Sequence, residues 1–324
     1  MSDQAPPPAS GQTVATPAAQ VAANGGPDSR TARLMRLATY ASVGVAVTLI
    51  AVKFVAWSLT ESVSLLSTLI DSLLDAFASL INLAAVHHAL QPADREHRFG
   101  HGKAEPLAGL AQAAFICGSA VFLVLEAGER LIHPKDVANT QLGYAVMVFS
   151  LIATIGLVMF QRYVVRRSGS VAINADSLHY QTDVLINGSV ILSLFLASEM
   201  GFRMADPLFA LGIAAYIVWG AVQIGRQALD ILMDKELPDE ERARIRAIVM
   251  AHPEVHGMHD LRTRSSGAQV FIQMHLELPP DMTLAAAHDI TDAVEVELLA
   301  VYPNAEVIIH EDPEGIEEFR PVFR

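Results

Sequence analysis

Two aspartates, Asp71 and Asp75, lie one helical turn apart in a stretch of the chain that otherwise consists almost entirely of apolar and small residues. This stretch, residues 62–90, is long enough to cross a lipid bilayer as a helix. An aspartate at the centre of a membrane costs about 2.5–3.5 kcal/mol on insertion scales, so the pair needs a compensating partner. His179 and Asp183 form a second pair at the same spacing in a later apolar segment. Together the two pairs offer one imidazole and three carboxylates, a ligand set that suits a divalent transition metal.

Residues four apart share one face of a helix, so each pair forms half of a metal site if the two helices pack together. Asn187 lies four residues after Asp183, and it either orients a ligand from outside the coordination sphere or bonds to a neighbouring helix. An alternative is that the four polar groups line a water-filled seam and bind no metal. Two matched pairs of metal-binding residue types are more than a seam requires, so we favour the metal site.

The charges of the four residues predict how such a site would work. Three ionised aspartates and a neutral histidine leave an excess of negative charge even when a divalent ion is bound. When the ion leaves, repulsion between the carboxylates in a low dielectric favours proton uptake, and histidine titrates nearest to neutral pH. Metal and protons therefore compete for the same ligands. A site near the membrane midplane that opens alternately to each side would exchange cytoplasmic metal for protons.

The composition is typical of a membrane protein with a smaller water-exposed part. The chain has 324 residues, of which 52% are hydrophobic and 18% are charged, whereas soluble proteins have about 25% charged residues. Its single cysteine, Cys117, excludes a disulfide framework and a thiolate metal cluster. The formal net charge of -13 argues against nucleic acid as a partner. Residues 1–30 are rich in Ala, Pro and Gly without periodicity, which predicts a disordered N-terminal extension.

Apolar segments recur six times, which predicts an all-α membrane domain of six transmembrane helices. The segments are 36–57, 63–90, 105–132, 141–164, 171–199 and 205–228. Basic residues gather before the first segment and in alternate loops, whereas the remaining loops hold only Lys135 and Arg203. Under the positive-inside rule, this asymmetry places both termini in the cytoplasm. Lys53, within the first segment, is expected to extend its side chain to the lipid interface.

After the sixth segment the pattern predicts a cytoplasmic α+β domain with the element order α-β-β-α-β. Pro238 and the acidic residues that follow it open a helix. The turn at 265–267 separates two strands, and apolar and polar residues alternate along the second strand. Thr283 caps another helix, and residues 306–310 form the last strand. We therefore expect a membrane domain over 31–234, a cytoplasmic domain over 235–315 and a C-terminal tail over 316–324.

Two further groups of metal-binding residue types lie outside the apolar segments. Asp94, His97 and His101 lie in the loop between the second and third segments, and three ligands without an evident fourth indicate either a weak site or a polar loop without metal. The cytoplasmic domain carries four histidines and an aspartate that suit one or two tetrahedral zinc ions, although isolated surface histidines are the alternative. These residues are His259, His275, His288, His310 and Asp312. We interpret the other histidines with no such arrangement as structural or solvated: His87, His88, His133, His252 and His256.

Long motifs in the chain resemble those of the cation diffusion facilitator family. The motifs are residues 71–75, 91–103, 175–183, 259–264 and 307–313, and the resemblance covers about residues 30–315. It implies a homodimer in the lipid of a bacterial inner membrane, with six membrane helices per subunit and a metallochaperone-like cytoplasmic domain. It also implies efflux of Zn²⁺, and of Fe²⁺ and Cd²⁺, in exchange for protons.

The resemblance implies a role for each group of residues. The transport site is Asp71, Asp75, His179 and Asp183; the loop site is Asp94, His97 and His101; a site for two zinc ions is His259, His275, His288, His310 and Asp312. Lys103 and Asp234 match a family charge pair near the dimer interface, whereas from the sequence alone each is an ordinary solvated charge. The N-terminal extension and the last residues have no counterpart in the family pattern.

Two other classes of function remain to be weighed against a transporter. An intramembrane metalloenzyme such as a prenyltransferase would hold magnesium and diphosphate with carboxylates, but it needs an all-oxygen site with Lys or Arg nearby. A metal sensor with a membrane anchor has no reason to bear the burial cost of Asp71 and Asp75. Here the site includes His179 and the basic residues lie in the loops, which argues against the enzyme. The burial cost of the two aspartates argues against the anchored sensor, so we favour the transporter. The ligand set does not decide between Zn²⁺, Fe²⁺, Cd²⁺, Co²⁺ and Mn²⁺.

Overall fold

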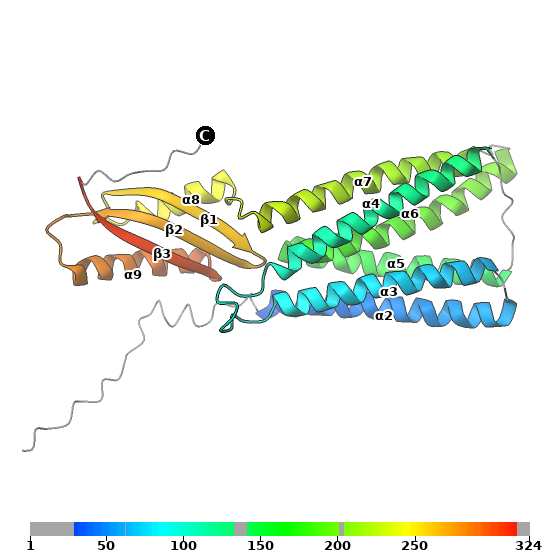
Figure 1. Cartoon of the computed structure of the whole chain (residues 1–324), viewed down its shortest axis with the longest axis horizontal. Helices are drawn as coiled ribbons and strands as arrows, with labels where there is room; N and C mark the ends of the chain where they lie inside the picture. Colours follow the sequence, from blue (N-terminus) through cyan, green and yellow to red (C-terminus); the bar gives the residue numbers. More distant parts are fainter. Residues whose placement is uncertain (1–28, 62, 133–140, 201–203, 316–324) are drawn as a thin grey trace, which may run out of the picture. The chain divides into compact units, whose positions relative to one another are not determined.

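The computed structural model describes residues 29–61, 63–132, 141–200 and 204–315 (Figure 1). Residues 1–28 of the predicted disordered extension (1–30) and the tail 316–324 lie outside the described residues, as do His133, Lys135 and Arg203. The last two residues of that extension, Ser29 and Arg30, are helical, so for them the prediction is wrong. The described chain divides into two compact units. One unit runs to Glu236 and includes Arg264–Gln269, and the other contains Leu237–Thr263 and the segment from Val270 onward.

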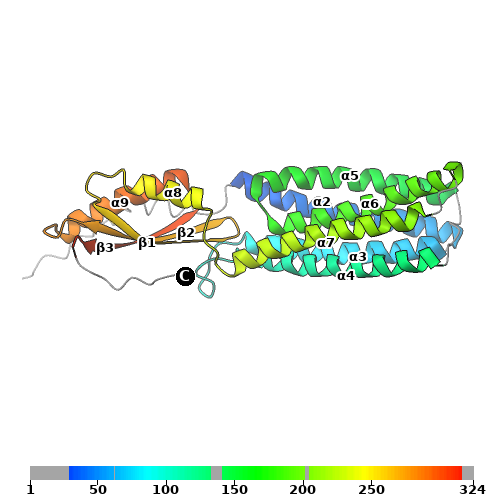
Figure 2. The same ribbon diagram turned by 90° about the horizontal axis from the view of Figure 1, so that it is seen from above.

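Six long helices of the described chain form the first unit (Figures 1 and 2). They are α2 (Ser29–Thr60), α3 (Val63–Ala89), α4 (Ala104–Ile132), α5 (Gln141–Ser168), α6 (Val171–Met200) and α7 (Ala205–Leu232). The shortest has 27 residues, about 40 Å of helix, which exceeds the hydrocarbon thickness of a bilayer. Among the described residues, five of these helices are long and apolar enough to cross a membrane: α2, α3, α4, α5 and α7.

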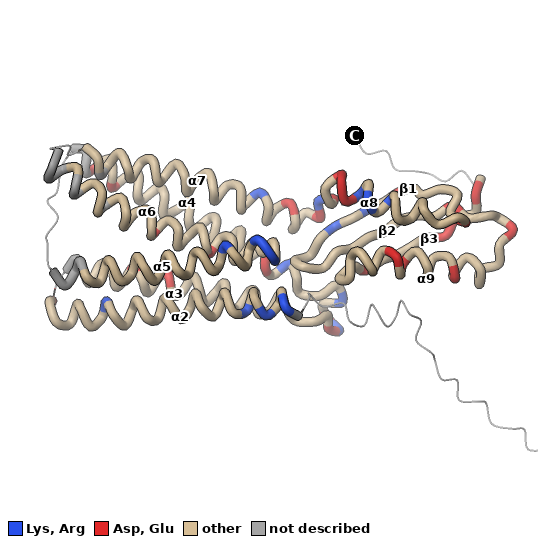
Figure 3. Tube along the Cα trace, turned by 180° about the vertical axis from the view of Figure 1, so that it is seen from behind, with Lys and Arg blue, Asp and Glu red and all other residues tan. Residues whose placement is uncertain are grey.

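The first half of helix α6 carries polar and charged side chains and lies inside the bundle. It contacts each of the other five helices of this unit. Nearly all of its first half is buried, including polar and charged side chains from Asp176 to Thr182. The other helices expose large apolar side chains such as Phe77, Phe122 and Trp219, as lipid-facing surfaces do. Lys and Arg gather at the end of the bundle where α2 begins and α5 ends (Figure 3).

A buried network of hydrogen bonds joins α2, α3, α5 and α6. Asp176 of α6 accepts hydrogen bonds from Ser42 Oγ and from Gln161 Nε2, both at 2.7 Å. Ser79 Oγ lies 2.9 Å from Ser42 Oγ and 2.9 Å from the Tyr180 hydroxyl. Buried polar groups with partners fix how helices pack, because any other arrangement leaves them without hydrogen bonds. The network therefore sets the position of α6, which carries one half of the predicted metal site.

The second unit has its elements in the predicted order: α8 (Asp239–Val249), β1 (Gly257–Ser266), β2 (Gln269–Leu278), α9 (Leu284–Val301) and β3 (Ala305–Pro313). Thr283 caps α9, because its side chain accepts a hydrogen bond from the Ala286 N–H at 3.2 Å. The strand order is β1-β2-β3, and β3 runs parallel to β2. This register places His275 beside His310.

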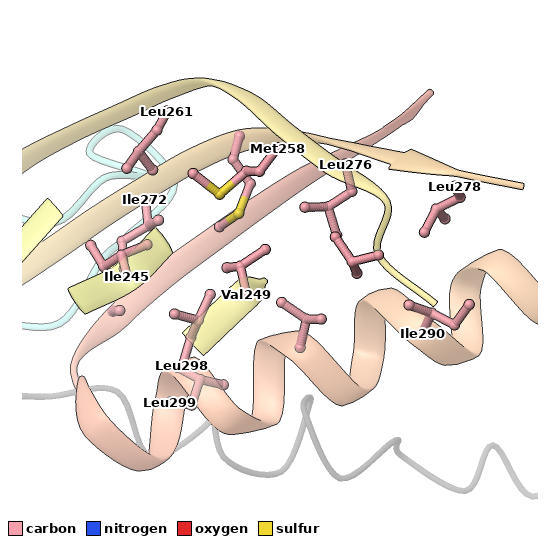
Figure 4. Close-up of a cluster of buried hydrophobic side chains, with 14 of the residues drawn as sticks. Ile245, Val249, Met258, Leu261, Ile272, Leu276, Leu278, Ile290, Leu298 and Leu299 are labelled. Carbon is pink, nitrogen blue, oxygen red and sulfur yellow. The ribbon is translucent and has the colours of Figure 1, made fainter. Parts of the chain in front are cut away.

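The apolar side chains of the sheet pack against α8 and α9 to form the core of this unit (Figure 4). Ile272, Met274 and Leu276 of β2 are buried here, as their alternation predicts, together with Val294 and Leu298 of α9. The intervening residues of β2 point to the opposite face of the sheet. That face carries the predicted histidine site.

Candidate metal sites

Helices α3 and α6 bring three of the four predicted transport ligands together. His179 Nε2 lies 3.0 Å from Asp75 Oδ1. One ligand atom from each of Asp75, His179 and Asp183 lies within 4.8 Å of the others. The side chain of His179 is 10% exposed and that of Asp75 is 20% exposed. Two carboxylates and an imidazole this close, shielded from bulk water, can hold a divalent cation.

Asp71 does not belong to this close group of ligand atoms. It lies one turn before Asp75 on the same face of α3, and its side chain is exposed in the single chain. Asn187 Nδ2 donates a hydrogen bond to the backbone oxygen of Asp183 at 2.7 Å. The amide is thus bound to its own helix, at the residue that supplies a ligand.

Lys53 lies beside this site, and the expectation that it extends to the lipid interface is wrong. Its Nζ donates hydrogen bonds to Ser72 Oγ at 2.7 Å and to the backbone oxygen of Thr68 at 3.1 Å. The ammonium group is within electrostatic range of Asp71, Asp75 and Asp183. Oxygen acceptors on α3 and nearby carboxylates stabilise the charge of Lys53 inside the bundle, in place of lipid headgroups. A lone lysine in an apolar segment was the signal available in the sequence.

The three predicted ligands of the loop also lie together in the structure. His97 Nδ1 is 3.3 Å from Asp94 Oδ1, and His101 Nε2 is 3.3 Å from Asp94 Oδ2. Their ligand atoms lie within 4.8 Å of one another. Hydrogen bonds from the backbone N–H groups of His97 and Glu96 hold the pKa of the Asp94 carboxyl below its usual value. The carboxylate therefore stays ionised at neutral pH, ready to bind a cation.

The predicted charge pair is formed within one chain. Lys103 Nζ lies 2.8 Å from Asp234 Oδ1, and Arg264 approaches the same oxygen at 3.3 Å. Partial burial would raise the pKa of Asp234, but the hydrogen bond and charge of Lys103, followed by those of Arg264, outweigh it and lower the pKa. Because the folded pKa is lowered, this carboxylate stabilises the fold above its unfolded pKa of about 3.9 and ceases to do so as the pH falls through the folded value.

We expect Asp234→Asn to lower the free energy of unfolding at pH 7 by about 0.2–1 kcal/mol, because both side chains of the pair are well exposed. Thermal unfolding of the detergent-solubilised protein at pH 7 and near pH 4 measures this effect. The difference between variant and wild type should shrink at the lower pH, and Lys103→Met should add little to Asp234→Asn. A difference of equal size at both pH values would contradict this assignment.

The second unit gathers four of its five predicted ligands around one buried carboxylate. Asp312 Oδ2 lies 2.8 Å from His275 Nδ1 and 3.4 Å from His259 Nε2, and Asp312 Oδ1 lies 3.2 Å from His310 Nε2. The rings of His259 and His275 are stacked with centroids 5.0 Å apart. Among the described residues, His259 Nε2 is buried without a hydrogen-bond partner. Three imidazoles and a carboxylate, with one buried ring nitrogen that makes no hydrogen bond, fit a zinc ion.

His288, the fifth predicted ligand, stands apart from this group. Its side chain is 63% exposed, and its Nε2 lies 3.9 Å from Asp292 on the same helix. The sequence-based prediction missed Glu277, whose Oε1 lies 2.9 Å from His259 Nδ1. A carboxylate that fixes a ligating histidine from outside is a common feature of zinc sites. Glu277 follows His275 by two residues in a strand, so the alternation that places both on one face could have identified it.

Two protein-family models match the chain, one over the helical bundle and one over the α+β unit. Residues 39–233 match the model of the cation efflux transmembrane domain, and residues 237–314 match that of the cation efflux protein cytoplasmic domain. Solved structures similar to about a quarter of this chain include the cytosolic domain of a cation diffusion facilitator family protein, 32% identical over 24% of this chain and 93% of that chain, with a TM-score of 0.23. Another is the metal-bound C-terminal domain of the CzcD transporter from Thermotoga maritima, 31% identical over 25% of this chain and all 100% of that chain, with a TM-score of 0.24.

Curated relatives match nearly the full length of the chain. The cation-efflux pump FieF of Klebsiella pneumoniae is 49% identical over 88% of this chain and 94% of its own length. FieF of Yersinia enterocolitica is 49% identical over 89% of this chain and 96% of its own. The similarity thus extends across the bundle and the α+β unit, and the relatives are transporters. The chain belongs to the cation efflux family, the cation diffusion facilitators, and is a membrane transporter of cations rather than an enzyme.

Proposed function

We propose that this transporter exports a divalent transition-metal ion, Zn²⁺ and also Fe²⁺ or Cd²⁺, in exchange for protons. The observation that carries the proposal is the meeting of Asp75, His179 and Asp183 in the helical bundle, with ligand atoms within 4.8 Å of one another. These residues come from helices that are about a hundred residues apart in the sequence, and each would be costly to bury without a partner. A metal ion that binds there during transport provides that partner.

The ligand types favour a borderline transition metal over a hard ion. An imidazole nitrogen binds Zn²⁺ and Fe²⁺ well, whereas Mg²⁺ and Ca²⁺ prefer oxygen ligands alone. We include Asp71 as the fourth transport ligand, since it lies one turn from Asp75 on the same face of α3. A modest shift of α3 against α6 during alternating access would bring its carboxylate to the ion.

Proton exchange follows from the contact between His179 and Asp75. With their ligand atoms 3.0 Å apart, the pair can hold a proton in the place that the metal would take. A metal ion that binds His179 Nε2 needs its lone pair, so a proton on that nitrogen must leave first. Occupancy by metal and occupancy by proton are therefore mutually exclusive, as antiport requires.

The remaining parts of the proposal concern topology and assembly. We propose six membrane spans, with α6 as a span shielded by its neighbours, both termini in the cytoplasm of a bacterial cell, and the first unit in the inner membrane. We propose further that the protein acts as a homodimer and that the Lys103–Asp234 pair lies near its interface. The site around Asp312 would bind zinc in the cytoplasm and favour one transport state, provided that zinc binds that state more tightly.

Purified protein in liposomes tests the exchange. Vesicles with an acidic lumen and a metal-sensitive dye inside should take up metal from a more alkaline medium, and each coupled proton supports about tenfold accumulation per pH unit of gradient. A panel of Zn²⁺, Fe²⁺, Cd²⁺, Co²⁺ and Mn²⁺ ranks the substrates. Uptake that is unchanged after an ionophore collapses the gradient would show that the protein does not exchange metal for protons.

A further inference from the structure

A third histidine lies beside the loop site, at the end of helix α3. The ring of His88 lies 4.4 Å from the ring of His101, centroid to centroid, with the planes at 61°. On the other side, the ring of His97 lies 4.5 Å from that of His101. Both His97 and His101 also contact Asp94 at 3.3 Å. Three imidazoles thus lie in a row next to one ionised carboxylate.

His101 at the centre of this row has a nitrogen without a partner. Its side chain is 3% exposed, and its Nε2 faces Asp94. Among the described residues, His101 Nδ1 is buried and has no hydrogen-bond partner. A buried polar nitrogen without a partner costs about 1–3 kcal/mol, so such atoms generally serve a purpose. A metal ion bound by this ring would offset that cost, because the bond to the metal stabilises a buried nitrogen in place of a hydrogen bond.

We propose that His88 is the fourth ligand of the loop site and that, with Asp94, His97 and His101, it forms a closed tetrahedral zinc site. This inference rests on the predicted loop site of Asp94, His97 and His101. It adds the fourth ligand, which was not evident from the sequence. Two imidazoles on one tetrahedral zinc have ring centres about 5 Å apart, given Zn–N bonds of about 2.0–2.1 Å. The observed spacings of 4.4 and 4.5 Å are close to that value. Small rotations of the exposed rings of His88 and His97 would complete the site.

A fourth protein ligand changes what the site does. A zinc ion with three protein ligands keeps an open position for exchange, whereas four ligands from the protein close the site. The ion would then remain bound and link the loop to the C-terminal end of α3. Helix α3 also carries Asp75, in its middle. The predicted role is therefore to hold the loop in place, separate from the passage of transported metal.

Zinc binding to the full-length chain tests this inference. The background variant carries Asp75→Asn and Asp183→Asn in the transport site and Asp312→Asn in the second unit, so that the loop is the remaining cluster under study. Titration against a chromophoric chelator gives the affinity and the stoichiometry, and Co²⁺ absorption reports coordination, since a four-coordinate tetrahedral ion absorbs more strongly than a six-coordinate one. We expect one ion per chain with a tetrahedral spectrum.

His88→Ala in this background should weaken binding by about 100-fold or more, since loss of a residue that merely supports a ligand already costs 10–100-fold. It should also replace the tetrahedral Co²⁺ spectrum by a weaker one. His87→Ala is the matched control, because His87 is the adjacent exposed histidine and points about 100° further round the helix. Its affinity and spectrum should equal those of the background.

Two results would overturn the inference, and they differ in whether the three-ligand loop site is also wrong. If the background chain binds no zinc, and Asp94→Ala changes nothing, then the loop site itself is wrong. If it binds zinc through Asp94 but His88→Ala and His87→Ala behave alike, then the loop site stands with three protein ligands and His88 is no ligand. Transport through Asp75 is measured in the otherwise wild-type chain and is independent of both results.

Discussion

Asp75→Asn is expected to reduce metal transport to the level of protein-free liposomes. The substitution keeps the shape of the side chain but removes the charge that faces His179 Nε2 at 3.0 Å. Loss of one charged ligand among so few should weaken metal binding by about 100-fold or more, because even loss of an outer partner costs 10–100-fold. Initial rates of zinc uptake, measured with an imposed proton gradient, give the effect directly.

The neighbouring residues should follow a graded order that the geometry predicts. Asp183→Asn should be as damaging as Asp75→Asn, because both carboxylates belong to the group of ligand atoms within 4.8 Å. Asp71→Asn should also reduce transport, because Asp71 is the proposed fourth ligand, but the loss should be smaller, since Asp71 lies outside that group in this state. Asn187→Ala serves as a control on α6, because its amide bonds to the backbone of Asp183. Equal losses for Asp71→Asn and Asp75→Asn would contradict the grouping of three.

The sequence selected the four residues of the proposed transport site, but it did not predict how closely each approaches the others. Because residues four apart share a helix face, Asp71 and Asp75 lie on one face of their helix, and His179 and Asp183 lie on one face of theirs. The distance between the faces depends on how α3 and α6 pack, and packing is fixed by contacts such as the buried network around Asp176. The structure therefore separates Asp71 from the other three, a difference that spacing alone does not contain.

The first half of helix α6 depends on packing in the same way. Residues 174–183 are too polar to face lipid, and in the structure α6 contacts the five other helices and exposes few side chains of this half. The expectation for Lys53 was also made from its own segment alone. Its hydrogen-bond partners lie on α3, which spacing within the first segment does not reveal. Tertiary contacts of this kind are not encoded in local spacing.

The α+β unit was easier to predict because its pattern is local. Alternation along β2 identified the buried face of the sheet, and Thr283 marked the start of α9. The register of the parallel strands β2 and β3 then places His275 beside His310 on the opposite face of the sheet. His288 was grouped with them by residue type and by the family resemblance. Its position on the exposed side of a helix, 3.9 Å from Asp292, is set by the packing of α9.

Asp312→Asn should remove metal binding from the second unit almost completely. One carboxylate contacts His275, His259 and His310 at 2.8–3.4 Å, and its side chain is 6% exposed, so no other group can replace it without rearrangement. Zinc that binds only the folded state raises its stability by about 2.7 kcal/mol at a free concentration of 100 times the Kd. A 100-fold loss of affinity reduces that gain to about 0.4 kcal/mol at the same zinc concentration. The zinc-induced rise in the melting temperature of the full-length protein should therefore largely disappear.

His288→Ala provides the matched comparison within the same unit. His288 is a predicted ligand of the same residue type as the others, but its exposed ring lies outside the cluster in the single chain. Both variants are measured in a chain whose transport and loop sites carry Asp75→Asn and Asp94→Ala, so that the shift reports on this unit. If His288→Ala keeps the zinc-induced shift while Asp312→Asn loses it, one ion per chain is held around Asp312. If His288→Ala abolishes the shift as fully as Asp312→Asn, the four-residue cluster is incomplete, and the second subunit of a homodimer must bring His288 to the metal.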